Sequence, residues 1–156
     1  MIVQEKGKMI FNMVKGFVCT ALLALLLASC AAPAAVSVES AWGRLSPAIP
    51  GAGGMYMVIK NTGGTPDRLM SAKSPACGKA EVHEMVKKAD GTMGMNLIEK
   101  PLEIPAGGQV ELKVGSYHVM CMMMKGDQFK VGNKIDLTLV FEKSGEKTIS
   151  TEIRAE

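Results

Sequence analysis

The 156-residue sequence is poor in aromatic side chains, with four Phe, two Tyr and one Trp, and it has no strong excess of either charge. Beyond residue 29, 15 Lys and Arg stand against 14 Asp and Glu. This balance argues against a nucleic-acid-binding protein and against a polybasic membrane surface. The sequence also lacks Cys-x-x-Cys and G-x-S-x-G, so neither a thiol oxidoreductase nor a serine hydrolase is indicated, and we expect a binding protein rather than an enzyme.

No apolar run reaches the roughly 20 residues that a membrane-spanning helix needs. The longest run lies between Lys15 and Ser29 and follows a basic segment, which is typical of a secretory signal. The run ends in Leu27-Ala-Ser-Cys30, which resembles the bacterial lipobox, whose Cys is acylated. An ordinary signal with an incidental Cys is the alternative, and the long leader is also compatible with a start at Met9 or Met13.

These features divide the chain into three parts. We expect a lipoprotein signal peptide over residues 1–29, a lipidated flexible tether over 30–35 that begins at Cys30, and one domain over 36–156. The protein is then exported and anchored by lipid at the periplasmic face. Ala31 is not the Asp that retains lipoproteins in the inner membrane, which favours the outer membrane if the cell is Gram-negative.

Short apolar runs separated by Gly, Pro, Asn and Asp clusters predict an all-β sandwich of eight or nine strands for the domain. No helical periodicity competes with them. The expected strands cover residues 36–44, 54–61, 67–73, 79–86, 92–99, 109–114, 117–123, 134–142 and 147–154.

Methionine is abundant, and three pairs of potential ligands have i, i+2 spacing. The pairs are His83 with Met85, Met93 with Met95, and His118 with Met120. Because alternate strand residues share a face, each pair presents two donors on one side of a strand. Buried packing is the other common use of Met, and we expect it for Met55, Met57 and Met70.

Thioether and imidazole donors together suit Cu(I) and are poor ligands for Mg²⁺, Ca²⁺ or Mn²⁺. In an exported protein, thioethers are better suited than thiolates as copper ligands, since thiolates in an oxidising compartment tend to form disulfides. Neutral donors of modest strength also indicate a site that can hand its ion over. A domain in which the His and Met side chains only pack is the structural alternative.

Most of the mature chain is similar to the PCuAC family of periplasmic copper chaperones. The segments that carry the resemblance are Ser40-Ala-Trp-Gly-Arg-Leu-Ser46, Gly54-Met-Tyr-Met57, Val82-His-Glu-Met85, Met93-Gly-Met95, Ile104-Pro-Ala-Gly-Gly108 and Tyr117-His-Val-Met120. The resemblance implies a cupredoxin-like Greek-key β-sandwich. It also implies carriage of Cu(I) to the dinuclear copper centre of cytochrome c oxidase, with subunit II or another copper chaperone as the acceptor.

By this resemblance the copper ligands are His83, Met95, His118 and Met120. The two intervals that separate His83, Met95 and His118 are each one residue longer than in the family motif. Met93 therefore stays an alternative to Met95, and Met85 is a possible additional ligand.

Cys121 alternates away from His118 and Met120, so we expect it in the core as a small apolar residue. A disulfide between Cys77 and Cys121 is possible in an exported domain, but the sequence leaves it open. An electron-transfer cupredoxin is a further alternative, and it would need a Cys thiolate beside two His and a weak axial Met.

Overall fold

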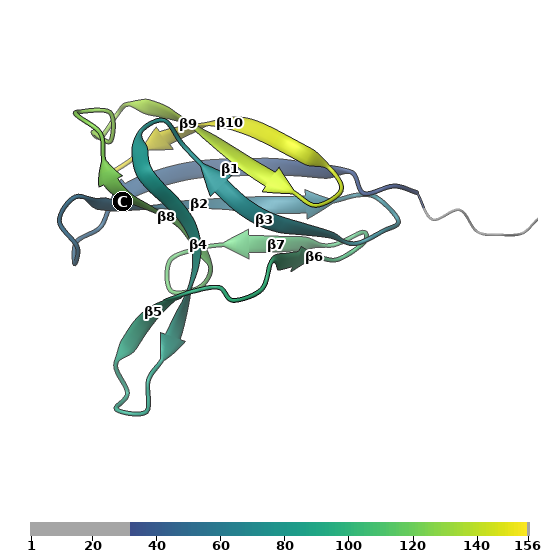
Figure 1. The fold of residues 1–156 in the computed structure, drawn as a ribbon, viewed down its shortest axis with the longest axis horizontal. Coiled ribbons are helices and arrows are strands. Elements are labelled where there is room, and N and C mark those ends of the chain that lie inside the picture. Colours follow the sequence, from purple (N-terminus) through teal and green to yellow (C-terminus); the bar gives the residue numbers. More distant parts are fainter. Residues whose placement is uncertain (1–31, 156) are drawn as a thin grey trace, which may run out of the picture. The chain divides into compact units, whose positions relative to one another are not determined.

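A computed structural model describes residues 32–155, so the predicted signal peptide and Cys30 lie outside the described residues. This part of the chain is built from ten strands and no helix (Figure 1), which confirms the all-β prediction. Within it, no helical segment has the length and hydropathy of a membrane span. The strands are β1 (Val36–Leu45), β2 (Ala52–Asn61), β3 (Asp67–Lys73), β4 (Cys77–Lys87), β5 (Met93–Leu97), β6 (Leu102–Ile104), β7 (Gln109–Leu112), β8 (His118–Met124), β9 (Lys134–Phe141) and β10 (Gly145–Ile153).

All nine expected strands are present, and the additional one is β6. It is three residues long, lies between Pro101 and Pro105, and pairs with β3. A strand this short between two prolines has no alternation to detect, which explains why the sequence did not predict it.

The strands form one hydrogen-bonded path in the order β5-β4-β8-β2-β1-β10-β9-β3-β6, and β7 pairs with β2 outside this path. All pairings are antiparallel except that of β1 with β10. β1 joins the two halves of the path, which fold over one another (Figure 1). The β4–β5 hairpin extends away from the body of the sandwich.

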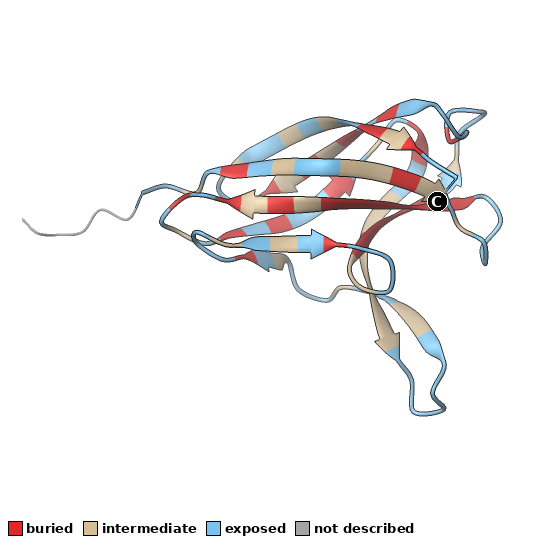
Figure 2. Cartoon of the chain, turned by 180° about the vertical axis from the view of Figure 1, so that it is seen from behind, coloured by how far each residue is buried: buried red, intermediate tan, exposed pale blue. Residues whose placement is uncertain are grey.

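A single apolar core lies between the halves, visible as the alternating buried positions along the strands in Figure 2. Met55 and Met57 of β2 are buried in it, as predicted. Met70 is not, because it lies on the outer side of β3, where the register with β9 shifts between Leu69 and Ser71, and it is 47% exposed. The expectation that Met70 packs in the core is therefore wrong.

The predicted tether is held against the domain over its described residues. Ala35 and Ala32 accept backbone hydrogen bonds from Thr62 and Gly64 of the β2–β3 loop. The Ala35 amide donates to Oδ1 of Asn61 at 3.1 Å. Residues 32–35 thus make hydrogen bonds to the domain, and the buried Asn61 side chain supplies one of the partners.

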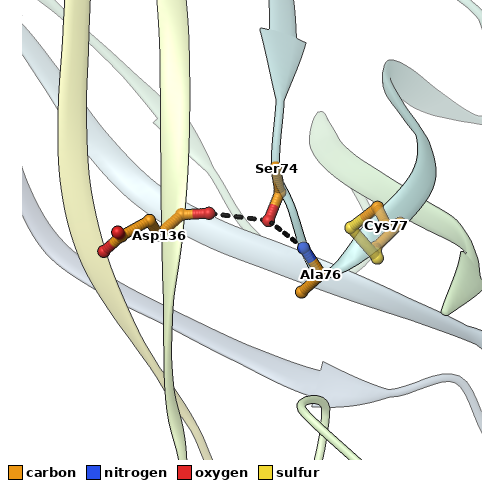
Figure 3. Close-up of a disulfide and its surroundings, with 5 residues drawn as sticks. Ser74, Ala76, Cys77 and Asp136 are labelled. Atoms are coloured by element: carbon orange, nitrogen blue, oxygen red, sulfur yellow. Dashed lines mark hydrogen bonds between the residues drawn. A yellow bond between two sulfur atoms is a disulfide. The ribbon is translucent and has the colours of Figure 1, made fainter. Parts of the chain in front are cut away.

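Cys77 and Cys121 form a disulfide that joins β4 to β8, with their Cα atoms 5.4 Å apart (Figure 3). Next to it, the Ser74 hydroxyl donates to the Asp136 carbonyl at 2.6 Å and accepts from the Ala76 amide at 3.3 Å. These bonds tie the start of β4 to β9. Cys121 is fully buried as expected, but as half of a disulfide and not as a free thiol.

Candidate metal centre

The predicted ligands share one face of the β5-β4-β8-β2 half of the sheet. His83 of β4 lies directly opposite His118 of β8, and their ring centroids are 6.0 Å apart. On the other side of β4, Met85 is paired with Met95 of β5. Strand register therefore assembles, from three strands, the donors that the sequence placed in separate segments.

Met95 and His118 come into contact although their strands are not adjacent. The Met95 Sδ atom lies 3.1 Å from Nε2 of His118, across β4. Met93, two residues earlier on β5, is paired with Lys87 near the end of the hairpin and is 52% exposed. Of the two candidate middle methionines, it is Met95 that lies beside the histidines.

Met120 lies on the same face, next to His118 along β8. It is paired with Glu81 of β4 on one side and with Gly54 of β2 on the other. Met120 is almost fully buried. Met85, by contrast, is half-buried, so the two thioethers differ in how much water can reach them.

His118 is held in the form that can bind a metal ion. Burial lowers the pKa of His118, the Ser116 carbonyl opposes this shift, and the nearby His83 adds to it. Its Nδ1 is 3.1 Å from that carbonyl oxygen, which can only accept, so Nδ1 carries the proton. The ring is therefore neutral at neutral pH, with the lone pair on Nε2 facing Met95.

His83 has a charged neighbour on its own strand. Its Nε2 lies 3.2 Å from Oε2 of Glu81, and Lys79 forms an ion pair with the other carboxylate oxygen. The hydrogen bond from Lys79 is the largest influence on the pKa of Glu81, which is lowered with a further contribution from His83 although burial opposes it. Glu81 is thus ionised at neutral pH.

A pocket of about 170 Å³ opens next to the predicted ligands. His118, Met95, Met85 and Met120 line it together with Tyr56 and Arg44, which the sequence reasoning did not single out. Tyr56 lies in Gly54-Met-Tyr-Met57, one of the segments that carry the family resemblance. A Cβ on Gly54 would lie 2.5 Å from the Tyr56 hydroxyl, so the glycine leaves room for that ring.

The donor set at this pocket is soft and neutral. No group of three or more His, Cys, Asp or Glu side chains that could hold a metal lies within residues 32–155. A metal ion bound here would therefore depend on methionine sulfur as well as imidazole, and such a donor set fits Cu(I).

The disulfide bears on the electron-transfer alternative. A blue-copper centre needs a thiolate ligand, but the Cys121 sulfur is bonded to Cys77 and lies in the core, on the opposite face of β8 from His118. Both cysteines of the described part are used in this bond. The structure therefore lacks, in residues 32–155, the ligand that this alternative requires.

Residues 36–153 match the model of the family described as "Putative lipoprotein LpqE-like". A relative from Leifsonia xyli subsp. xyli, "Putative lipoprotein Lxx21020", is 29% identical over 119 residues, which cover 76% of this chain and 69% of the relative.

Similar solved structures include the apo PCuAC domain from PmoF1, with 30% identity and a TM-score of 0.64 over 78% of this chain and 94% of that one. The copper-bound PCuAC domain from PmoF2 has 26% identity and a TM-score of 0.63 over 80% and 97%. CuI-DR1885 from Deinococcus radiodurans, at 24% identity and a TM-score of 0.60 over 83% and 84%, shares the fold. The chain belongs to the LpqE-like family, and its domain is a PCuAC domain with the cupredoxin-like fold.

Proposed function

We propose that this domain binds Cu(I) through His83, Met95, His118 and Met120 and carries the ion as a copper chaperone. The contact between Met95 Sδ and His118 Nε2, 3.1 Å apart, is the observation that carries the proposal. It brings a thioether and a bare imidazole nitrogen together beside a second imidazole. Met85, paired with Met95, is an additional candidate ligand.

The chemistry of the donors favours carriage over permanent storage. Imidazole and thioether ligands are neutral, so the charge of a bound ion is not cancelled, and thiolates bind soft copper more strongly. A thiolate-rich acceptor can therefore remove the ion without any catalysed bond change. The copper-bound PCuAC domain from PmoF2, a similar structure at 26% identity, supports this function.

Competition for Cu(I) against a chromophoric chelator tests the binding step. We expect the double variant His118→Ala with Met120→Ala to lose most of its affinity, while Met70→Ala, an exposed methionine on β3, leaves it unchanged. Equal affinities of the wild type and the double variant would rule out this site.

The acceptor we propose is the dinuclear copper centre of cytochrome c oxidase, through subunit II or through another copper chaperone. Its support is the family resemblance and the thiolate-rich nature of such a centre. Mixing the Cu(I)-loaded protein with a soluble, metal-free subunit II domain should produce the optical spectrum of the dinuclear centre after oxidation. Copper that stays on this domain would contradict this acceptor.

We propose that the mature protein is exported and anchored by a lipid on Cys30, which follows Leu27-Ala-Ser in the sequence. Ala32, two residues later, is already bound to the domain, so the domain would lie close to the membrane. Cys30→Ala should move the protein from the detergent-rich to the aqueous phase on detergent partitioning. Fractionation of Gram-negative membranes would then distinguish the outer from the inner membrane.

A further inference from the structure

We propose that Glu81 is a positioning residue that makes His83 present Nδ1, and not Nε2, to the copper ion. The inference rests on the copper-binding function proposed above. Nε2 of His83 lies 3.2 Å from Oε2 of Glu81. A carboxylate accepts hydrogen bonds, so Nε2 carries the proton, and the lone pair with which this imidazole would bind a metal ion lies on Nδ1.

The surroundings of Nδ1 are consistent with a ligand position. This atom is buried and has no hydrogen-bond partner among the described residues. Buried polar atoms without partners are rare in proteins and call for an explanation, one of which is an ion that is bound there. A metal ion would satisfy the Nδ1 lone pair, for which no N–H or O–H group of residues 32–155 is in place.

His118 is arranged in the opposite sense. Its Nδ1 donates to the Ser116 carbonyl at 3.1 Å, which leaves Nε2 as the bare nitrogen beside Met95. The two rings are cross-strand neighbours with an interplanar angle of 56°. The site therefore uses different nitrogens of its two imidazoles, and a different hydrogen bond selects each one.

Glu81 is itself held in place. Lys79 binds its Oε1 oxygen, which leaves Oε2 for His83, and the Glu81 side chain is only 17% exposed. Its backbone is paired with that of Met120, another proposed ligand. A carboxylate that accepts from a metal-bound histidine fixes the ring and strengthens it as a ligand, and losing such a partner typically weakens metal binding by about 10–100-fold.

Long-range ¹H–¹⁵N NMR of the ¹⁵N-labelled, metal-free protein reads the tautomers directly. We expect a proton on Nε2 of His83 and on Nδ1 of His118. Glu81→Ala should give His83 a mixture of tautomers and raise the Cu(I) Kd by about tenfold or more. Glu84→Ala is the matched control, because it removes the same charge from the same strand. The Glu84 side chain lies on the face of β4 opposite to that of Glu81 and His83. This variant should change neither readout.

Titration with Cu(I) completes the test. We expect the ¹⁵N resonances of His83 Nδ1 and His118 Nε2 to shift most. A larger shift at His83 Nε2 than at Nδ1, a metal-free His83 with its proton on Nδ1, or a Glu81→Ala protein that behaves like Glu84→Ala would overturn the inference and leave the copper function intact. The absence of any imidazole response to Cu(I) would instead overturn the proposed function.

Discussion

Met95 of β5 and His118 of β8 contact each other across the intervening strand β4, with Sδ of the methionine 3.1 Å from Nε2 of the histidine. β4 lies between their strands and contributes His83 and Met85 to the same face. The contact depends on the β4–β5 hairpin, which extends from the sandwich (Figure 1). The pairing of β5 with β4 places Met95 next to His118, the first residue of β8.

The choice between the two methionines of β5 can be tested with a matched pair of variants. Met95→Leu removes the thioether beside His118 with little change in volume and should raise the Cu(I) Kd by about tenfold or more, equivalent to about 1.4 kcal/mol. Met93→Leu makes the same chemical change at an exposed position of the same strand and should have no effect. Chelator competition measures both, and a larger loss in Met93→Leu would move the ligand to Met93.

The disulfide should contribute strongly to stability because it closes a long loop. Cys77 and Cys121 are 44 residues apart, and a loop of this length predicts a contribution of about 4 kcal/mol. Urea denaturation of the double variant Cys77→Ala with Cys121→Ala should therefore show a much lower free energy of unfolding than the wild type.

The same disulfide links the strands that carry His83 and His118, so its loss should also weaken Cu(I) binding where the double variant still folds. The wild type in reducing agent, whose sequence is unchanged, is the control for packing effects of the two alanines. Equal stability of the oxidised and reduced wild type would contradict a stabilising role.

Asp67 should make the stability of the domain depend on pH. It is fully buried; burial raises its pKa, but hydrogen bonds from Ser144, Lys143 and Arg68 outweigh this and hold the pKa below the usual value. A carboxyl with a lowered folded-state pKa stabilises the protein above its unfolded pKa of about 3.9, and this contribution is lost as the pH falls through the folded pKa.

Asp67→Asn should therefore cost on the order of 1–3 kcal/mol at pH 7, because at least one of the part-buried amides of Lys143 and Ser144 loses its acceptor. The difference from the wild type should shrink in acid. Asp136→Asn, an exposed change on β9, controls for the loss of charge. A difference that is constant from pH 7 to pH 2 would contradict this role of Asp67.

Gly53 and Gly54 of β2 face different sides of the sheet, and alanine should act differently at each. A Cβ on Gly53 would lie 2.3 Å from the Phe129 ring and 2.8 Å from the Arg44 carbonyl oxygen. Gly53→Ala should therefore destabilise the fold by about 1–3 kcal/mol, the usual cost of overpacking.

At Gly54 the added methyl meets the hydroxyl end of Tyr56, which can move. Gly54→Ala should therefore cost less stability than Gly53→Ala but disturb the pocket that Tyr56 lines. Thermal unfolding and Cu(I) competition on both variants separate the two effects. A Gly54→Ala protein with the larger loss of stability would contradict this difference.

The sequence alone determined the all-β class, nine of the ten strands and the shared face of His83 with Met85, of Met93 with Met95 and of His118 with Met120. It misplaced Met70, which is exposed. These properties follow from local patterns, since turn residues end strands and alternation assigns faces within a strand. The same alternation placed Cys121 in the core and away from His118, and the register of β4 and β8 is consistent with that assignment.

Only the tertiary structure decided which of these faces meet. Met93 and Met95 are equivalent by alternation, and it is the register of β5 on β4 that sets Met95 beside Met85 and within reach of His118. The bond between Cys77 and Cys121 and the docking of residues 32–35 on Asn61 likewise join segments that no local pattern relates. Strand pairing is a long-range property, so the donors could be identified from the sequence, but the geometry that brings them together could not.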